Sequence, residues 1–289
     1  FKLNPPATLT GTVLTEIKVT GPLDNPIVAG NVKNTTPVTV VNSDFKIDNP
    51  EANSNPGLSN QNRNAIVLKE VTSNFKVNSK LLLVTLTDVF VLPQLGGKIT
   101  GSGTIALSKP EAIDLRFQAT DLPGDTIAQT YNGGKAIPTK LGTLSATVSV
   151  SGSPTKPNTL VTWNAPEAQY PAKGEITIVG NSINLQNTTA QVEGGTAMIN
   201  GTIVDGNIAL NVKTDGIGLN KFSSELRGIF SSDLKVTGNI ANLSPQTIRV
   251  AGTTRLSQGV AVIQDPIVAD IEWTGKQLNI NNASAPDLS

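Results

Sequence analysis

The sequence predicts an all-β fold, in which a repeated unit builds one long, curved, antiparallel-rich amphipathic sheet with a few short helices. Three observations predict it. A glycine-bounded phrase occurs three times, most strands alternate apolar with polar residues, and aromatic side chains make up only 4% of the 289 residues. Self-similarity of this kind indicates a repeat architecture. So few aromatic residues are unusual for the centre of a closed sandwich.

The repeated phrase is typical of a strand with a turn at each end. Its copies are 11–21, 142–152 and 228–238. In each copy glycine opens the phrase, an apolar residue stands third, Ile, Val or Leu seventh, valine ninth, a hydroxyl residue tenth, and glycine closes it. A proline then leads into another apolar run. These prolines are Pro26, Pro157 and Pro245.

A second shared phrase supports the repeat. Paired glycines at 96–97 and 194–195 are each followed, six residues on, by Gly-Thr-Ile. A final copy begins at 278–282, which resembles 183–187. The unit is therefore about 90 residues long, with several strands and one short helix. We expect residues 1–289 to form a single continuous array of repeats cut from a longer protein.

Strands are expected wherever apolar residues alternate with polar ones between turn residues. Besides the three phrases, these segments are 27–32, 38–47, 65–68, 74–78, 80–92, 113–121 and 208–215. In 80–92 nearly every position is apolar, so alternation does not say which face is buried. The stretch 48–64 holds Asn-Pro steps and little to bury, so we expect a mobile insertion.

Two short helices are expected, at 125–131 and 219–226, directly after the strands that end in Thr-Asp. The aspartates of those steps, Asp121 and Asp215, recur at equivalent places. We interpret them as caps of the following turn or helix rather than as a calcium site.

Composition argues against several function classes. Lys plus Arg equals Asp plus Glu, at 22 each, so no charge excess favours nucleic acid. The chain has no Cys and no His, which removes thiolate chemistry and the commonest general base and metal ligand. The acidic residues fall on polar faces or at strand ends, where solvated carboxylates are expected. These are Asp114, Asp121, Glu175, Asp215 and Asp233. We expect no enzyme, cofactor or metal site.

The alternating strands are apolar on one face and polar on the other, and such a sheet must cover its apolar face. Helices are too few to do so. Either the sheet forms the ordinary core of a sandwich, or it curves around a channel. The residues expected to line a channel are Ile17, Val19, Ile113, Leu115, Phe117, Leu144, Val148, Val150, Ile176, Ile178, Ile183, Leu185, Ile208, Leu210, Val212, Leu234, Val236, Ile248 and Val250.

The repeated phrases resemble a known family. The Val-Thr/Ser-Gly step followed by a proline, at 19–26 and 150–157, together with the Thr-Asp step before a short helix, is similar to the TamB branch of the AsmA-like proteins. The resemblance covers essentially the whole chain. It implies a U-shaped sheet, the β-taco, whose hydrophobic groove conducts phospholipid acyl chains between two envelope membranes. The parent protein would be anchored in the inner membrane and cross the periplasm or intermembrane space.

The resemblance also implies partners. They are a phospholipid or other acyl lipid, the neighbouring repeats of the full-length protein, and an Omp85-type outer-membrane protein that meets a region outside this chain. The alternative function is a structural or protein-interaction β-scaffold, which aids assembly or translocation of outer-membrane proteins. A continuous apolar lining would favour the conduit, and a closed, well-packed core would favour the scaffold.

Overall fold

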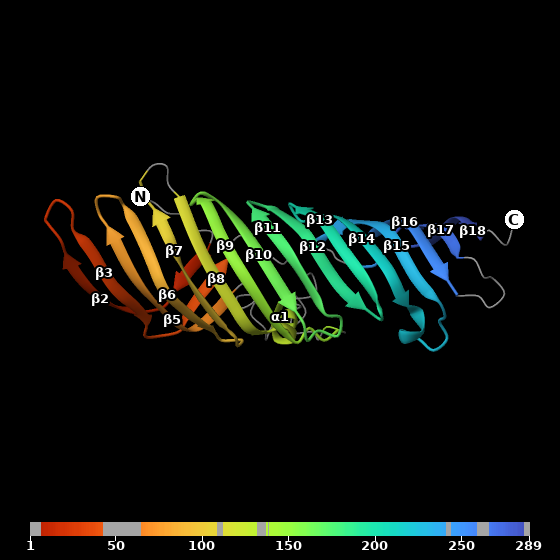
Figure 1. Ribbon diagram of the computed structural model, residues 1–289, viewed down its shortest axis with the longest axis horizontal. Coiled ribbons are helices and arrows are strands. Elements are labelled where there is room, and N and C mark those ends of the chain that lie inside the picture. The colour runs from red at the N-terminus through yellow and green to blue at the C-terminus, as the bar shows by residue number, and fades with distance from the viewer. Residues whose placement is uncertain are drawn as a thin grey trace, which may run out of the picture. The chain divides into compact units, whose positions relative to one another are not determined.

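The computed structural model describes residues 7–42, 65–108, 112–131, 137, 139–240, 244–258 and 266–285. Within these ranges the chain is nearly all β, with eighteen strands and one α-helix (Figure 1). The predicted all-β class is therefore confirmed. The chain divides into two compact units, Phe1–Trp163 and Asn164–Ser289. The expected insertion at 48–64 lies outside the described residues.

The first unit holds a sheet whose strand pairs are all antiparallel. Its strands are β1 (Ala7–Thr10), β2 (Val13–Thr20), β3 (Ile27–Asn34), β4 (Val38–Asn42), β5 (Ala65–Asn78), β6 (Leu83–Pro93), β7 (Lys98–Ala106), β8 (Ala112–Pro123), β9 (Thr143–Ser153) and β10 (Lys156–Ala165), the last of which runs into the boundary between the units. From β5 onward each strand pairs with the next along the chain. On the other side of β5, β3 pairs with one half and β4 with the other half.

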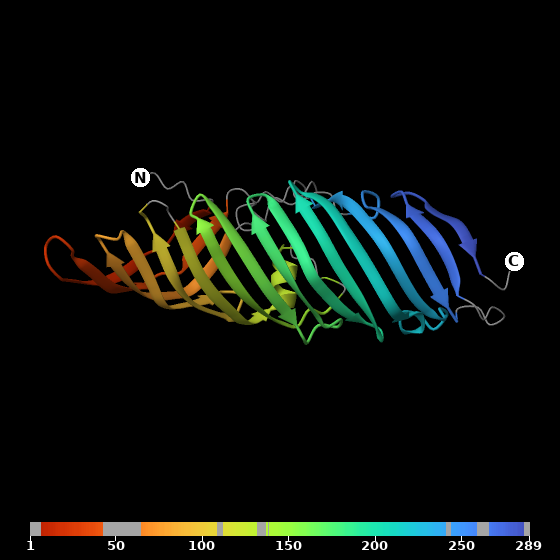
Figure 2. The ribbon, with the colours of Figure 1, turned by 45° about the horizontal axis from the view of Figure 1, so that its top comes forward.

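The second unit is an uninterrupted meander. Its strands are β11 (Ala172–Val179), β12 (Ser182–Val192), β13 (Gly195–Val204), β14 (Asn207–Gly218), β15 (Ile229–Asn239), β16 (Arg249–Ser257), β17 (Ile267–Trp273) and β18 (Leu278–Ser284). Each pairs antiparallel with its successor. The view in Figure 2 shows these strands side by side within the unit.

Strand registers repeat along the chain as the sequence phrases do. In the first unit Leu86 of β6 pairs with Gly103 of β7, and in the second Leu185 of β12 pairs with Gly201 of β13. Both pairs are followed by the same bulge, described below. Taking β2, β9 and β15 as first strands, β6, β12 and β18 are equivalent strands, and so are β7 and β13.

Several long strands are bent by β-bulges. Pairing shifts between Leu86 and Val89 in β6 and between Leu185 and Thr188 in β12. The inserted residues Asp88 and Asn187 have φ of 52° and 50°, a left-handed conformation that Asp and Asn tolerate better than most residues. Each bulge adds one residue, which bends the strand and reverses the alternation beyond it. This explains why alternation within 80–92 does not identify its buried face.

One predicted helix is confirmed and the other is wrong. α1 (Gly124–Tyr131) begins beside Asp125, whose carboxylate accepts the backbone N–H groups of Leu141 and Gly142 at 2.7 and 3.1 Å. It lies against the ends of β8 and β9 (Figure 1). The segment 219–226 forms only a 3-10 helix at Leu219–Lys221. A helix this short is marginal, and the Ser223 hydroxyl accepts a local backbone N–H from Glu225 instead.

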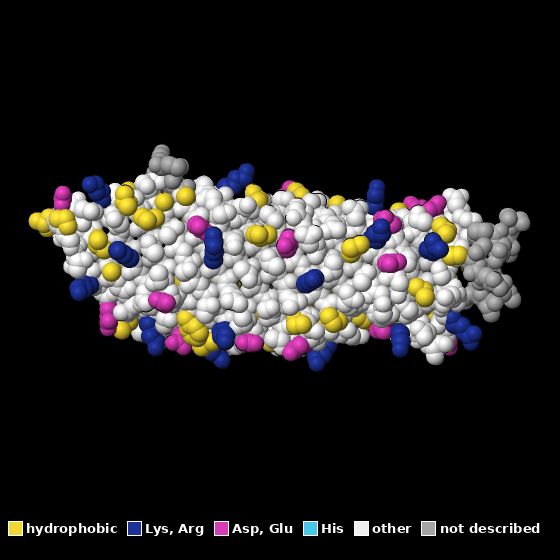
Figure 3. Space-filling view, viewed as in Figure 1, with side chains coloured by type: hydrophobic (Ala, Val, Ile, Leu, Met, Phe, Trp, Pro, Cys, Tyr) yellow, Lys and Arg dark blue, Asp and Glu magenta, His cyan; other side chains and the backbone are white. Residues whose placement is uncertain are grey.

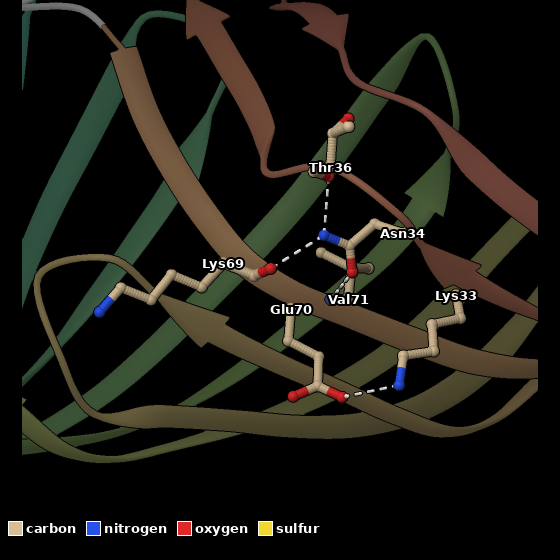
Figure 4. A network of polar contacts seen from close by, with 6 residues as sticks. All are labelled: Lys33, Asn34, Thr36, Lys69, Glu70 and Val71. Atoms are coloured by element: carbon tan, nitrogen blue, oxygen red, sulfur yellow. Dashed lines mark hydrogen bonds and ion pairs between the residues drawn. The ribbon is translucent and has the colours of Figure 1, made fainter.

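The segments predicted as two strands at 65–68 and 74–78 form one strand, β5. It continues through a bulge of its own at Lys69 and past the bulge of β6 at Asp88. The buried side chain of Asn34 fills the gap where β5 changes partner from β4 to β3 (Figure 4). Asn34 Nδ2 donates to the carbonyl oxygens of Thr36 and Lys69, each at 2.9 Å. Asn34 Oδ1 accepts the backbone N–H of Val71 at 2.6 Å. One amide thus replaces the missing ladder hydrogen bonds.

We expect Asn34→Ala to lower the free energy of unfolding by about 2–3 kcal/mol, because it leaves buried backbone groups without partners. The matched control is Asn31→Ala on the same strand, since Asn31 is exposed and donates only to the Glu16 carboxylate at 3.1 Å. The control should change stability by less than about 0.5 kcal/mol. Thermal and denaturant unfolding of both variants measure the difference. Equal effects would show that the Asn34 contacts contribute nothing special.

Candidate functional site: the apolar face of the strands

Each long strand places its larger apolar side chains on one face. In β14, Ile208, Leu210 and Val212 are half-buried, whereas Ala209 and Asn211 between them are exposed. β8 shows the same division. Figure 3 shows a face of the strands on which hydrophobic side chains are scattered among polar ones and backbone. In each unit, we call the side of the sheet that carries the rows described below the apolar face.

In the first unit the registers join these residues into rows that cross seven strands, β2, β3 and β5 to β9. Directly opposed residues on one face lie about 5 Å apart and touch. One row reads Ile17, Gly30, Phe75, Leu86, Gly103, Leu115 and Val150. The next reads Val19, Val28, Val77, Val84, Ile105, Ile113 and Gly152. No polar side chain interrupts either row.

The second unit repeats this arrangement across all eight of its strands. Its longest row reads Ile176, Leu185, Gly201, Leu210, Val236, Val250, Trp273 and Leu278. A neighbouring row reads Ile199, Val212, Leu234, Gly252, Ile271 and Ile280. The apolar lining is therefore continuous within each unit.

Glycines in the rows make room for large neighbours. The Phe117 ring lies over Gly101, and the Phe75 ring lies within contact of the place where a Gly30 Cβ would stand. The Leu115 side chain covers Gly103 in the same way. Large side chains beside glycines keep the face smooth, because each fills the hollow that its neighbour leaves.

The apolar face is not packed like the centre of a closed sandwich. Among the described residues, no large side chain is fully buried. The buried hydrophobic residues are Ala119, Ala165, Ile217, Ala269 and Ala285. In a close-packed interior many aliphatic side chains lose nearly all contact with solvent. The larger residues of the rows instead remain partly accessible. No second layer formed by the described residues therefore covers them at native density.

Within each unit, the structure places the predicted channel residues on the apolar face of that unit. All but two are half-buried. The two exceptions are Ile17 and Val19, which are 62% and 63% exposed because β2 pairs only with β3 among the described strands. Ile248 comes directly before β16 and lies against Gly238.

Sequence reasoning missed further members of the face. Ile105 and Ile203 belong to the repeated Gly-Thr-Ile phrase, whose glycine pairs with a row leucine, so that phrase was the available signal. Val84, Leu86 and Val89 were hidden by the bulge in β6, which reverses their alternation. Trp273 also joins the face, and its indole N–H donates to the Pro245 carbonyl at 2.7 Å.

On the polar face, asparagine and acid pairs hold the bulges. Asn187 donates to Glu175 at 3.1 Å, and Asn282 donates to Asp270 at 3.0 Å. At the β6 bulge the roles are exchanged, and Asn74 donates to Asp88 at 2.9 Å. Each pair joins the bulged strand to the strand before it. These polar side chains therefore serve the bend, and none of them contacts the apolar face.

The aspartates expected to act as caps lie at bulges. Asp121 is itself the left-handed residue of the β8 bulge, with φ of 57°, and its carboxylate is 3.9 Å from Lys98 Nζ. Asp215 precedes Gly216 in the β14 bulge and accepts the Ser231 hydroxyl at 3.1 Å. The capping interpretation is therefore replaced by a role in bending the strands. No group of acidic residues within the described ranges is arranged to hold a metal ion.

Asp270 provides a pH-dependent contribution to stability. Hydrogen bonds from Asn282 and then Thr253 lower the pKa of its carboxyl below the ordinary value of 3.8. A lowered pKa means that the ionised form stabilises the fold above about pH 4, and that this stabilisation is lost as the pH falls through the lowered pKa. We expect wild type to unfold at a higher temperature than Asp270→Asn at neutral pH, with the gap closing in acid. A gap independent of pH would contradict this assignment.

Comparisons of the chain with protein-family models, with curated proteins and with solved structures found no match. Within the described ranges, no helix has the length and apolar character needed to cross a bilayer. The function is therefore argued from the apolar face itself.

Proposed function

We propose that the apolar face binds the acyl chains of phospholipid and conducts them along the array. Two features support this proposal: the continuity of the apolar rows and the incomplete burial of their side chains. Apolar rows run without interruption across seven strands in one unit and eight in the other, and none of their large side chains is fully buried. The described residues do not fill the space over these rows to native density, so an apolar ligand is the natural cover.

The energetics suit a ligand that moves. An acyl chain of about 16 methylenes gains roughly 13 kcal/mol gross on leaving water, at about 0.8 kcal/mol each. The face therefore needs no polar recognition group to hold it. Because successive strands present the same Val, Ile and Leu side chains, the binding energy is similar at successive positions. With strands about 4.8 Å apart, the eight-strand row of the second unit extends the lining over about 34 Å.

The bulges supply the curvature that a groove requires. A bulge bends its strand and increases the local twist. The extra residues lie in β5, β6 and β8 of one unit and in β12, β14 and β18 of the other. We infer that each unit curves about its apolar face into a U-shaped groove. Among the described residues no large side chain is fully buried, which favours this groove over the closed scaffold.

We place the chain in a TamB-like parent protein, as a non-enzymatic segment of a bridge that carries lipid between inner and outer envelope membranes. In that setting it lies in the periplasm or intermembrane space. Its ligand is phospholipid, and its neighbours are further repeats. An Omp85-type partner belongs to another region of the parent protein.

Mass spectrometry of an organic-solvent extract of the purified protein tests the proposal. We expect stoichiometric phospholipid or fatty acid, absent from a mock purification. Protein stripped of lipid should take up added phospholipid from vesicles. A clean extract combined with no uptake of added lipid would contradict the proposal.

A further inference from the structure

We propose that β18 presents an acceptor edge for one more antiparallel strand, with the Gly-Thr-Ile pattern of β7 and β13. This inference concerns a polypeptide partner and does not depend on lipid binding. Among the described strands, β18 pairs only with β17. Its other edge is the surface in question.

The internal repeat identifies what covers this edge. β18 is the third copy of the strand that appears earlier as β6 and β12. The three share an apolar, polar, apolar, polar sequence that ends in a left-handed residue, which is Asp88, Asn187 or Asn282. β6 is covered by β7 and β12 by β13, in the same register. Because β18 has the same sequence pattern and the same bulge, we expect a strand like β7 and β13 to pair with it.

The exposure of β18 shows which side chains an added strand would bury. Ile280 and Leu278 of β18 are 61% and 52% exposed. Their counterparts in β12, Leu185 and Ile183, are less exposed: both are half-buried, because β13 lies beside them. By this equivalence an incoming strand places its glycine opposite Ile280 and its isoleucine opposite Leu278.

Backbone groups of the same two residues point to the open edge. In an antiparallel pair, opposed residues alternate between those that exchange hydrogen bonds and those that do not. The β17–β18 hairpin closes with the Thr274 N–H donating to the Gln277 carbonyl at 3.0 Å. Counting on from that pair, the N–H groups of Leu278 and Ile280 face away from β17. They are free to pair with an added strand, which is the basis of β-strand addition.

The donors of the incoming strand follow from the earlier repeats. In the first unit the Leu107 N–H donates to the Leu82 carbonyl at 2.8 Å. Alternation from that pair places the N–H groups of Ile105 and Gly103 toward β6, and that of Thr104 away from it. A peptide with the β7 sequence therefore has donors that face the acceptor edge and donors that do not.

The test uses the intact chain and a synthetic peptide with the sequence Lys98–Ala106. We expect the peptide to protect the amides of Leu278 and Ile280 from hydrogen exchange. N-methylation at Ile105 should weaken binding by about tenfold, because it removes an edge-facing donor and adds a methyl group there. N-methylation at Thr104 should change binding by less than about threefold, because that donor faces away.

Substitutions in the protein supply a second readout. Ile280→Ala should weaken peptide binding by about fivefold through lost apolar contact. Ile17→Ala is the matched control, because Ile17 is equally exposed but lies on β2, which is not a copy of β6. Equal effects of the two N-methyl groups, or no protection at Leu278 and Ile280, would overturn the proposal. So would occupation of this edge by a second copy of the chain, seen as a stable oligomer that the peptide does not dissociate.

Discussion

Leu210→Glu should weaken phospholipid binding by the second unit at least about tenfold, and phospholipid uptake should fall accordingly. Leu210 stands in the middle of the longest apolar row, between Gly201 and Val236. A carboxylate at this position must either lose its hydration against an acyl chain or keep water in the lining. Either outcome costs more than the 1.4 kcal/mol that corresponds to a tenfold change. In the first unit Val148→Glu, opposite Phe117, is expected to act in the same way.

The fold should survive this change, because Leu210 is only half-buried. Ala209→Glu is the matched control. Ala209 is the neighbouring residue of the same strand and is exposed on the polar face. The Ala209→Glu substitution adds the same negative charge as Leu210→Glu. Uptake of a fluorescent phospholipid from vesicles, measured beside circular dichroism, separates binding from folding. Normal uptake by the folded double variant Val148→Glu/Leu210→Glu would refute the lining assignment.

Gly201→Ala should lower the free energy of unfolding by about 3 kcal/mol. A Cβ on Gly201 would overlap the Ala209 carbonyl oxygen and crowd the Cα of Leu210 at 2.7 Å. Both contacts are with backbone of β14, which no side-chain rotation can relieve. The strands would have to separate beside the β12 bulge.

Gly180→Ala provides the comparison. Gly180 has a left-handed φ of 57°, but a Cβ there meets nothing within 4 Å. Its cost is therefore the conformational strain alone, about 1 kcal/mol. Denaturant unfolding of both variants measures the difference. If Gly201→Ala were as stable as Gly180→Ala, the distance between β13 and β14 at Gly201 would have to be larger than in the structure.

The fold class follows from the sequence because alternation and turn glycines are local signals. In 144–150 and 208–212 no bulge intervenes, so alternation alone places Leu144, Val148 and Leu210 on the apolar face, as observed. The Gly-Thr-Ile phrases likewise carry enough information to identify equivalent strands. Where a stretch of strand has no bulge, the two-residue alternation of its side chains is sufficient to predict which residues lie on the apolar face.

The remainder depends on bulges and on contacts distant in sequence. Alternation fails in 80–92 because Asp88 adds a residue to the strand, and only its left-handed conformation reveals this. An Asn or Asp that ends an apolar, polar, apolar, polar phrase is the signal that could have predicted it. The continuity of β5 could not be predicted, because it depends on Asn34, thirty-five residues before its hydrogen-bond partner Lys69.

The most direct test of the lipid proposal is a map of the residues that touch an acyl chain. A phospholipid with a photoreactive diazirine in its acyl chain is loaded into the protein, and the complex is illuminated. The cross-linked residues are then identified by mass spectrometry. The account predicts labels on row residues such as Leu115, Val150, Leu210 and Val236, and none on their polar-face neighbours Arg116 and Lys213. Labels spread equally over both faces, or confined to chain ends and loops, would contradict it.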